Sequence, residues 1–298
     1  MRSAGALDLA EQRMRPCRVS VVVITRDRGD EAARTAALLA TLPERPAVIV
    51  VDNGSTDGTP DRVRSLAPSA AVLEAGRNLG GAARNAGVAH ASTPYVAFSD
   101  DDSWWAPGSL ARATALLDDH PSVGLICARV LLGPEERLDP ICRIMAASPL
   151  PRPDGMPGPC LAGFVACASV VRRGAFLEAG GFDQRLGVGG EEELLAIDLL
   201  SRGWHLVYAD EIVAHHHPSK VRSRTLRRSN LTRNALWTAW LRRPAFPALG
   251  ASCRLGWAAL QDPPERRGLA AAVAGAGWVA RQRRVIGPEV EAQLRLLS

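Results

Sequence analysis

The sequence contains only six cysteines, and no two of them form a Cys-x-x-Cys pair. Zinc sites and disulfide frameworks both depend on closely spaced or regularly patterned cysteines. The wide spacing therefore argues against both kinds of site and indicates reduced, mostly buried thiols. The cysteines are Cys17, Cys127, Cys142, Cys160, Cys167 and Cys253.

Long apolar runs are also missing. The longest apolar stretch near the end, Gly268 to Ala280, is too short and too rich in alanine and glycine to span a bilayer. Residues 1–16 carry charges throughout and lack the apolar core of a signal peptide. We therefore expect a cytoplasmic protein in which residues 1–17 form a polar, weakly ordered lead-in.

Lysine is almost absent, because Lys220 is the only one and arginine carries nearly all of the positive charge. The formal net charge is +5, but it is unevenly placed. From Lys220 onward there are 15 basic and 4 acidic residues, so the net charge of the preceding residues is near −6. An acidic body beside a basic tail suits a bound metal together with an anionic partner or membrane surface.

Short β-branched runs alternate with helical patterns in the first hundred residues, which predicts an α/β fold with a largely parallel sheet. Neither a Gly-x-Gly-x-x-Gly motif nor a P-loop follows the first strand, which argues against the common nucleotide-binding alternatives. The expected strands are 18–25, 47–51, 71–74 and 95–98, and the expected helices are 31–42, 59–66 and a third that ends at His90.

The second half of the chain is less regular. Residues 133–160 are rich in proline and glycine and predict a long loop, a kind of segment that is often functional. The other predicted elements are strands at 123–132, 164–171 and 204–208 and helices at 111–118, from about 173, and at 194–201.

Polar clusters follow three of the predicted strands, at the point where each strand ends. They are Thr25-Arg26, Asp52-Asn53 and Asp100-Asp101-Asp102. Ligands of open α/β sheets bind outside the carboxyl ends of the strands, so these clusters are expected to converge on one edge.

Several motifs occur in one order along the chain, and together they are specific. They are Asp52 to Asp57, Asn78 to Asn85, Asp100 to Asp102, Gly181-Phe182-Asp183, Gly190 to Glu193, and a late histidine. This set resembles the inverting, nucleotide-sugar-dependent glycosyltransferases of family 2, which have the GT-A fold. The resemblance covers about two-thirds of the chain, from about Val19 to His217.

The resemblance implies a GT-A catalytic domain over residues 18–218, with a Rossmann-like, largely parallel central sheet flanked by helices. Its nucleotide-binding half would be residues 18–105 and its acceptor half residues 106–218. Residues 219–298 would form a basic, helical C-terminal segment.

The resemblance also implies a nucleotide site at the strand ends. Thr25 and Arg26 would line the nucleoside pocket, and Asp52 would accept hydrogen bonds from the base, which in this family is usually uracil. Asn78 and Arg84 would lie near the nucleotide, with Arg84 suited to phosphate. The alternatives are that Asp52 only forms a turn and that Arg84 is an exposed helix arginine.

The Asp triplet resembles the Asp-x-Asp element of the family. Asp100 would contact the ribose or the water shell of the metal, and Asp102 would ligate Mg²⁺ or Mn²⁺ that bridges the donor diphosphate. Asp101 could simply point into the fold. The alternative is a solvated acidic turn that caps the next helix.

Three consecutive histidines follow the last predicted strand. The family's late histidine falls best on His216, which would complete the metal site, and His215 is the next candidate. Because a strand alternates sides, His215 and His217 should face one way and His216 the other. A surface histidine tract is the alternative.

Inversion requires one base on the face opposite the leaving group. Alignment on Gly190 assigns this role to Glu192, although a glutamate replaces the aspartate of the family motif. Glu191 is the second candidate, and Glu193 could bind the acceptor. An acidic helix N-terminus would produce the same pattern without catalysis.

Two other features leave alternatives open. Trp104 or Trp105 could border the sugar site, with Trp105 as the preferred candidate, or both could be core residues. The arginine-rich segment from Leu231 to Leu241 could lie on an anionic membrane surface or bind a diphosphate, or it could pack back onto the catalytic domain. No motif for nucleic-acid binding is present.

The sequence thus predicts a metal-dependent inverting glycosyltransferase. It would move a hexose-type sugar from UDP or dTDP to an acceptor hydroxyl, in the cytoplasm or at the inner face of the membrane. A non-catalytic nucleotide-sugar or polyanion-binding protein on the same fold is the main alternative. A nucleotidyltransferase would need a Gly-rich basic loop after the first strand, and residues 25–29 match one poorly.

Overall fold

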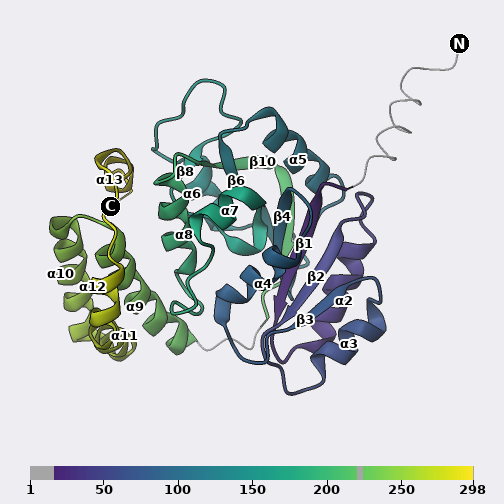
Figure 1. The fold of residues 1–298 in the computed structure, drawn as a ribbon, viewed down its shortest axis with the longest axis horizontal. Helices are drawn as coiled ribbons and strands as arrows, with labels where there is room; N and C mark the ends of the chain where they lie inside the picture. Colours follow the sequence, from purple (N-terminus) through teal and green to yellow (C-terminus); the bar gives the residue numbers. More distant parts are fainter. Residues whose placement is uncertain (1–16, 220–223, 298) are drawn as a thin grey trace, which may run out of the picture.

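The computed structural model describes residues 17–219 and 224–297, so the predicted lead-in lies outside the described residues except for Cys17. One sheet forms the centre, and helices cover it (Figure 1). The strands are β1 (Val19–Thr25), β2 (Ala47–Asp52), β3 (Ala71–Glu74), β4 (Tyr95–Asp100), β5 (Ser103–Trp105), β6 (Val123–Leu132), β7 (Arg137–Leu138), β8 (Cys160–Leu161), β9 (Ser169–Arg172) and β10 (His205–His216).

Helices connect these strands and follow the last of them. In the catalytic part they are α2 (Gly29–Ala40), α3 (Thr59–Leu66), α4 (Ala83–His90), α5 (Ser109–Asp119), α6 (Pro140–Ala146), α7 (Arg173–Ala179) and α8 (Glu191–Leu200), with short 3₁₀ turns η1 (Gly80–Ala82) and η2 (Ala166–Ala168). The C-terminal segment contains α9 (Arg224–Arg242), α10 (Ala245–Gln261), α11 (Pro263–Ala274), α12 (Ala276–Gln282) and α13 (Pro288–Arg295).

The sheet runs in the order β3-β2-β1-β4-β9-β6-β10-β5, with β7 beside β6 and β8 beside β10. Strands β3, β2, β1 and β4 are parallel, as the alternating pattern predicts. Strand β9 lies antiparallel between β4 and β6, and β5 is antiparallel to β10. The sheet is therefore parallel in its first half and mixed in its second.

Three predictions for the second half are wrong in part. The strand predicted at 204–208 begins at His205 and continues to His216 as β10. The predicted loop 133–160 contains helix α6, because Asp139 caps its start by accepting a hydrogen bond from Ile141 N at 3.0 Å, and Pro140 occupies the first position. The strand predicted at 164–171 begins only at Ser169, since residues Ala166–Ala168 form the turn η2.

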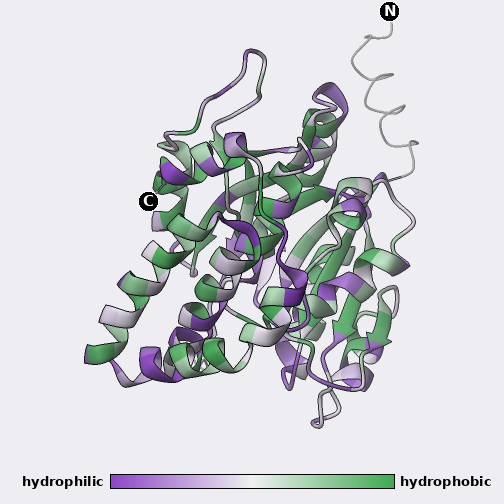
Figure 2. Ribbon diagram, turned by 60° about the vertical axis from the view of Figure 1, so that its left-hand side comes forward, coloured by the Kyte–Doolittle hydropathy of each residue, from purple (hydrophilic) through white to green (hydrophobic). Residues whose placement is uncertain are grey.

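The core fixes where the strands end. Strand β1 is buried on both faces, and the strands of the sheet are predominantly hydrophobic in Figure 2. Helix α4 packs closely on β1 at Gly87, where an added Cβ would lie 2.4 Å from Val22 Cγ1. Only glycine allows this approach, which sets the position of Arg84 one turn earlier on the same helix.

The C-terminal helices pack back onto the part of the chain that contains the sheet, as one of the sequence alternatives proposed. Leu186 and Leu194 form a buried cluster with Leu236, Trp237 and Leu241 of α9. Arg242 of the same helix also makes a bidentate ion pair with Asp198 of α8. Within residues 17–219 and 224–297, no helix is long and apolar enough to cross a membrane.

Candidate active site

The ends of β1, β2 and β4 come together, as the sequence predicts. Thr25 lies beside Asp52 in the register of β1 and β2, and Ile24 lies beside Asp100 in that of β1 and β4. The polar residues that follow these strands therefore share one edge of the sheet.

Asp52 forms a turn and still keeps one oxygen for a ligand. Its side chain is buried, and Oδ2 accepts hydrogen bonds from the backbone N–H groups of Gly54 at 3.2 Å and Ser55 at 3.0 Å. The other oxygen, Oδ1, is buried and has no hydrogen-bond partner among the described residues. The turn role and the predicted base-binding role are thus compatible.

Asn53 anchors the Gly-rich turn, a role that the sequence analysis missed. Its buried Oδ1 accepts a hydrogen bond from Leu79 N at 2.6 Å, and its Nδ2 donates to Gly80 O at 3.0 Å. The predicted nucleotide residue Asn78 is exposed next to this anchor and accepts a hydrogen bond from Gly80 N at 2.9 Å. Asp-Asn-Gly signals a turn in the sequence, but not this contact across 26 residues.

Asp101 is the member of the triplet that points into the fold. It accepts hydrogen bonds from Thr25 Oγ1 at 3.0 Å and from Arg28 Nη1 at 2.9 Å. Burial raises the pKa of Asp101 to about 6, although Arg28 acts in the opposite direction. Of the two arginines in this loop, Arg28 faces this cluster, whereas the predicted Arg26 is exposed and its Nε lies 3.5 Å from Asp27 Oδ2.

The buried Arg84 forms an ion pair with the partly exposed Asp100. Arg84 Nη2 lies 2.5 Å from Asp100 Oδ1, and the guanidinium also lies over the Phe182 ring, 5.6 Å from its centroid. Burial alone would lower the pKa of Arg84, but Asp100, Glu191 and Glu192 outweigh it and raise the pKa. Arg84 is therefore not an exposed helix arginine, and its charge links the triplet to the acidic helix start.

Asp102 faces His216 across the site. His216 Nε2 lies 3.4 Å from Asp102 Oδ1, and Ser219 N donates to Asp102 Oδ2 at 3.1 Å. His216 Nε2 is buried and has no hydrogen-bond partner in the described part of the chain. A carboxylate and an imidazole nitrogen that face each other in this way are suited to share a divalent cation.

The third predicted metal ligand is engaged elsewhere. Asp100 is paired with Arg84, and among the described residues no three His, Cys, Asp or Glu side chains are arranged to hold a metal. Because Mg²⁺ usually binds through one or two carboxylates plus substrate phosphates, a pair of protein ligands fits such a site.

The histidines alternate along β10 as predicted. His215 stacks on Trp104 with ring centroids 5.6 Å apart, and His217 meets the edge of the same ring at 4.7 Å, while His216 faces Asp102. Trp104 is half-buried. Trp105 is only 1% exposed, which fits the core-packing alternative rather than a sugar contact.

The acidic triplet Glu191 to Glu193 forms the first turn of α8, directly after Gly190. Glu191 is buried and accepts a hydrogen bond from Gly189 N at 2.5 Å. Glu192 is half-buried; burial and then the Glu191 carboxylate raise its pKa to about 8. Glu193 is exposed. Desolvation also raises the pKa of Glu193. The three carboxylates therefore have different environments, and the pKa of Glu192 is raised by both burial and a neighbouring carboxylate.

The loop before α8 is held from both sides. Gly81 N donates to Gly187 O at 2.8 Å, which joins the loop to the Gly-rich turn. On the other side, the fully buried Asn234 of α9 donates to Leu186 O at 2.9 Å and to Gly189 O at 2.7 Å. Helix α9 is thus part of the support of the candidate base.

A second asparagine supports the same region. Asn85 Oδ1 accepts a hydrogen bond from Phe182 N at 3.0 Å, and its Nδ2 donates to Phe182 O at 2.8 Å. An added Cβ at Gly181 would lie 2.7 Å from Asn85 Oδ1, so the Gly181-Phe182 motif needs glycine here. Neither Asn85 nor Asn234 was a sequence candidate.

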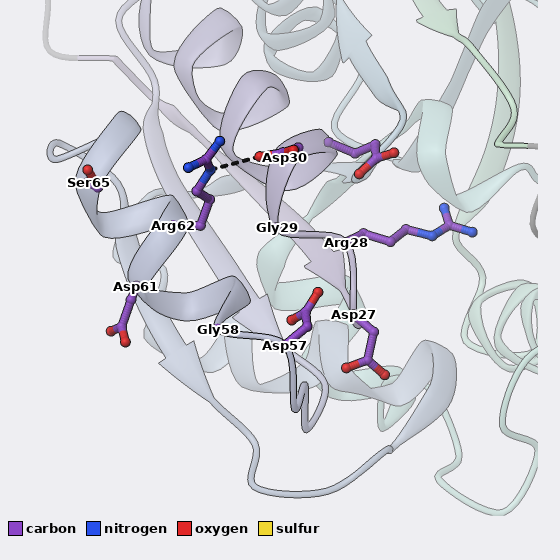
Figure 3. Close-up of a pocket in the computed structure, with 10 residues that line it drawn as sticks. Asp27, Arg28, Gly29, Asp30, Asp57, Gly58, Asp61, Arg62 and Ser65 are labelled. Atoms are coloured by element: carbon purple, nitrogen blue, oxygen red, sulfur yellow. Dashed lines mark hydrogen bonds and ion pairs between the residues drawn. The ribbon is translucent and has the colours of Figure 1, made fainter.

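A separate open hollow of about 690 Å³ lies between the first turns of α2 and α3 (Figure 3). Five carboxylates line it, and the Arg28 side chain extends away from the Asp30–Arg62 pair. None of the predicted metal or base residues lines this hollow, and its negative charge would repel a diphosphate. The carboxylates belong to Asp27, Asp30, Glu31, Asp57 and Asp61.

Comparison with known sequences identifies a family. The family model described as glycosyl transferase family 2 matches residues 20–179. An N-acetylglucosaminyl-diphospho-decaprenol L-rhamnosyltransferase from Mycobacterium tuberculosis is 29% identical over 239 residues, which cover 66% of this chain and 75% of that protein.

Solved glycosyltransferase structures have a similar fold. One is the mannosyltransferase PcManGT from Pyrobaculum calidifontis, in complex with GDP-Man and Mn²⁺. Its alignment with this chain has a TM-score of 0.61 and 23% sequence identity, and it covers 96% of this chain and 86% of the PcManGT chain. Another is GalNAc-T7 with UDP, GalNAc and Mn²⁺. Its alignment has a TM-score of 0.57 and 15% sequence identity, and it covers 78% of this chain and 49% of the GalNAc-T7 chain. These similarities confirm the GT-A fold.

The two asparagines of α9 provide a test of how the loop before α8 is supported. Asn234→Ala should lower the free energy of unfolding by about 1–3 kcal/mol, because Gly189 O loses its side-chain donor and Leu186 O keeps only the bond from Arg233 Nη2. Asn230→Ala, one turn earlier, removes the exposed bond to Val188 O and should cost less than about 1 kcal/mol. Urea unfolding measures both, and equal losses would contradict the assigned role of Asn234.

Proposed function

The chain belongs to glycosyl transferase family 2, and we propose that it is a metal-dependent, inverting glycosyltransferase. It would transfer a hexose-type sugar from a nucleoside diphosphate, UDP or dTDP, to an acceptor hydroxyl. The observation that carries this proposal is the set of charges around Arg84. This buried cation pairs with Asp100 and also interacts with Glu192, whose pKa is raised.

The nucleotide would bind at the ends of β1 and β2. Asp52 Oδ1 is a buried acceptor on a rigid turn, and a base with N–H groups would satisfy it. The Gly-rich turn that Asn53 anchors would border the nucleotide through Asn78. Thr25 would act through Asp101, to which its hydroxyl donates, and Arg26 would contact the nucleoside from the exposed loop.

Asp102 and His216 would hold a divalent cation together with the donor diphosphate. When bound, Mg²⁺ or Mn²⁺ would stabilise the negative charge that grows on the leaving nucleoside diphosphate. Asp100 would keep Arg84 in place and reach the ribose or the water shell of the metal. The Arg84 guanidinium adds positive charge near the same diphosphate.

Glu192 would remove the proton of the acceptor hydroxyl during a single displacement. A pKa near 8 makes its carboxylate a stronger base than an ordinary glutamate. Glu191 is the second candidate, but its carboxylate already accepts a hydrogen bond from Gly189 N. Glu193 is exposed and could bind the acceptor, and Trp105 would contribute to sugar binding only if it left the core.

The alternative of a non-catalytic nucleotide-sugar-binding protein rests on the Gly-Glu-Glu-Glu sequence in place of an aspartate motif. Transfer and binding assays distinguish the two functions. Because the relative at 29% identity is named as an L-rhamnosyltransferase that acts on a lipid-linked diphosphate sugar, rhamnose and such acceptors belong in the panel.

Nucleoside diphosphate release tests the donor and metal assignments. With Mn²⁺ and a panel of UDP-, dTDP- and GDP-sugars, at least one donor should be hydrolysed or transferred. Asp102→Ala should lower turnover by about 100-fold or more and weaken Mn²⁺-dependent UDP or dTDP binding measured by calorimetry. The exposed Asp210→Asn, which disturbs only the contacts of Asp210 with Arg129 and the Tyr208 hydroxyl, is the control. Absence of turnover together with unchanged nucleotide affinity of Asp102→Ala would refute the proposal.

The pH dependence of kcat/KM tests the base. The carboxylate form of Glu192 is the active one, so the rate should rise with pH and level off above about 8, rather than above the ordinary value of 4.5. Glu192→Gln should lower kcat by about 10²–10⁴-fold and leave donor binding intact. Glu191→Gln and Glu193→Gln are the comparison variants. Full activity of Glu192→Gln would transfer the role to one of these neighbours.

A further inference from the structure

Helix α10 is apolar on two opposite faces, and only one of them is covered. Its inner face packs on α9 and α11 through residues that include Ala248, Ala251 and Ala259. The opposite face carries Phe246, Leu249, Cys253, Trp257 and Leu260, here called the outer face of α10.

The outer face is strongly exposed. Phe246 is 87% exposed, and Trp257 and Leu260 are each 69% exposed. The residues recur at intervals of three and four, so they form one stripe about 20 Å long at 1.5 Å per residue. A helix that is apolar all round is normally buried, so this face lacks the surroundings for which its composition is suited. Figure 1 shows α10 on the outside of the C-terminal helices.

The charges around this stripe are positive. Helix α10 contains no acidic residue, and its one charged residue is the exposed Arg254. Residues 224–297 contain 13 basic and 4 acidic residues. Asp262 and Glu265 of this segment are paired with Arg228, and Glu291 is paired with Arg243. The acidic side chains are thus largely neutralised within the segment.

Several arginines of the same helices remain exposed. These arginines are Arg254, Arg266, Arg267, Arg281 and Arg284. None of the five makes an ion pair with another described residue. A second copy of the chain would bring the same positive charge to the interface and be repelled. An anionic lipid surface offers both the complementary charge and an apolar layer, and tryptophan is favoured at such an interface.

We propose that the outer face of α10 docks this chain on an anionic membrane surface. Phe246, Trp257 and Leu260 insert below the lipid headgroups, and the exposed arginines contact the headgroup phosphates. The sequence suggested such a contact for the arginine-rich helix α9, but α9 packs inward and α10 carries the free face. This inference does not depend on sugar transfer.

Co-sedimentation with vesicles tests the docking. Wild-type protein should bind vesicles of phosphatidylcholine with phosphatidylglycerol at low salt, bind pure phosphatidylcholine much less, and be released by high salt. The triple variant Phe246→Ser, Trp257→Ser, Leu260→Ser should lose at least about tenfold in partitioning, because the apolar contact is removed.

A matched control carries three similar substitutions on the catalytic domain. Leu66→Ser, Ile144→Ser and Leu177→Ser replace side chains that are about half exposed or more, and binding should stay within about twofold of wild type. Circular dichroism melts check that both triple variants fold. Asp102→Ala should lose transfer but keep vesicle binding, so failure of docking and failure of the proposed enzyme remain distinguishable.

Three results would overturn the proposal. They are absence of wild-type binding to anionic vesicles, equal binding to neutral and anionic vesicles, and unchanged binding of the α10 triple variant. Sedimentation velocity without lipid adds a fourth, because a wild-type dimer that the α10 substitutions dissociate would identify the face as a contact between copies.

Discussion

The ion pair between the buried Arg84 and the partly exposed Asp100 is the contact on which the rest of the site depends. It connects helix α4 to the end of β4, and its positive partner also interacts with Glu191 and Glu192 at the start of α8. Loss of Asp100 would leave the charge of the buried Arg84 without its nearest partner. The pair thereby holds the Asp triplet and the start of α8 in one relative position.

Around this pair, side-chain amides connect loops that are distant in sequence. Asn53 holds the Gly-rich turn, Asn85 holds Phe182, and Asn234 holds the loop before α8. Each bonds to backbone groups that no regular secondary structure would satisfy. Glycines at 80, 81 and 181 allow these segments to approach closely. The candidate base is therefore positioned by the catalytic domain and by the C-terminal helix α9 together.

The sequence predicts the parallel half of the fold well, because buried β-branched runs and polar strand ends are local signals. Helix α3, strand β3 and strand β6 were predicted with their observed bounds. The second half was predicted less well, since β9 is inserted antiparallel between distant strands and α6 depends on a cap inside a proline-rich stretch. At the site, alternation along β10 separated His216 from its neighbours, whereas Arg28 and the three asparagines act through long-range contacts that leave no local pattern.

The central claim is a single displacement in which one carboxylate, Glu192, acts on the acceptor while the diphosphate leaves from the opposite face. The anomeric configuration of the product tests this claim most directly, through the one-bond carbon–hydrogen coupling at the anomeric carbon measured by NMR. The account predicts a product linkage of configuration opposite to that of the donor. A product that retains the donor configuration would contradict it, since retention requires a second displacement or a front-face reaction.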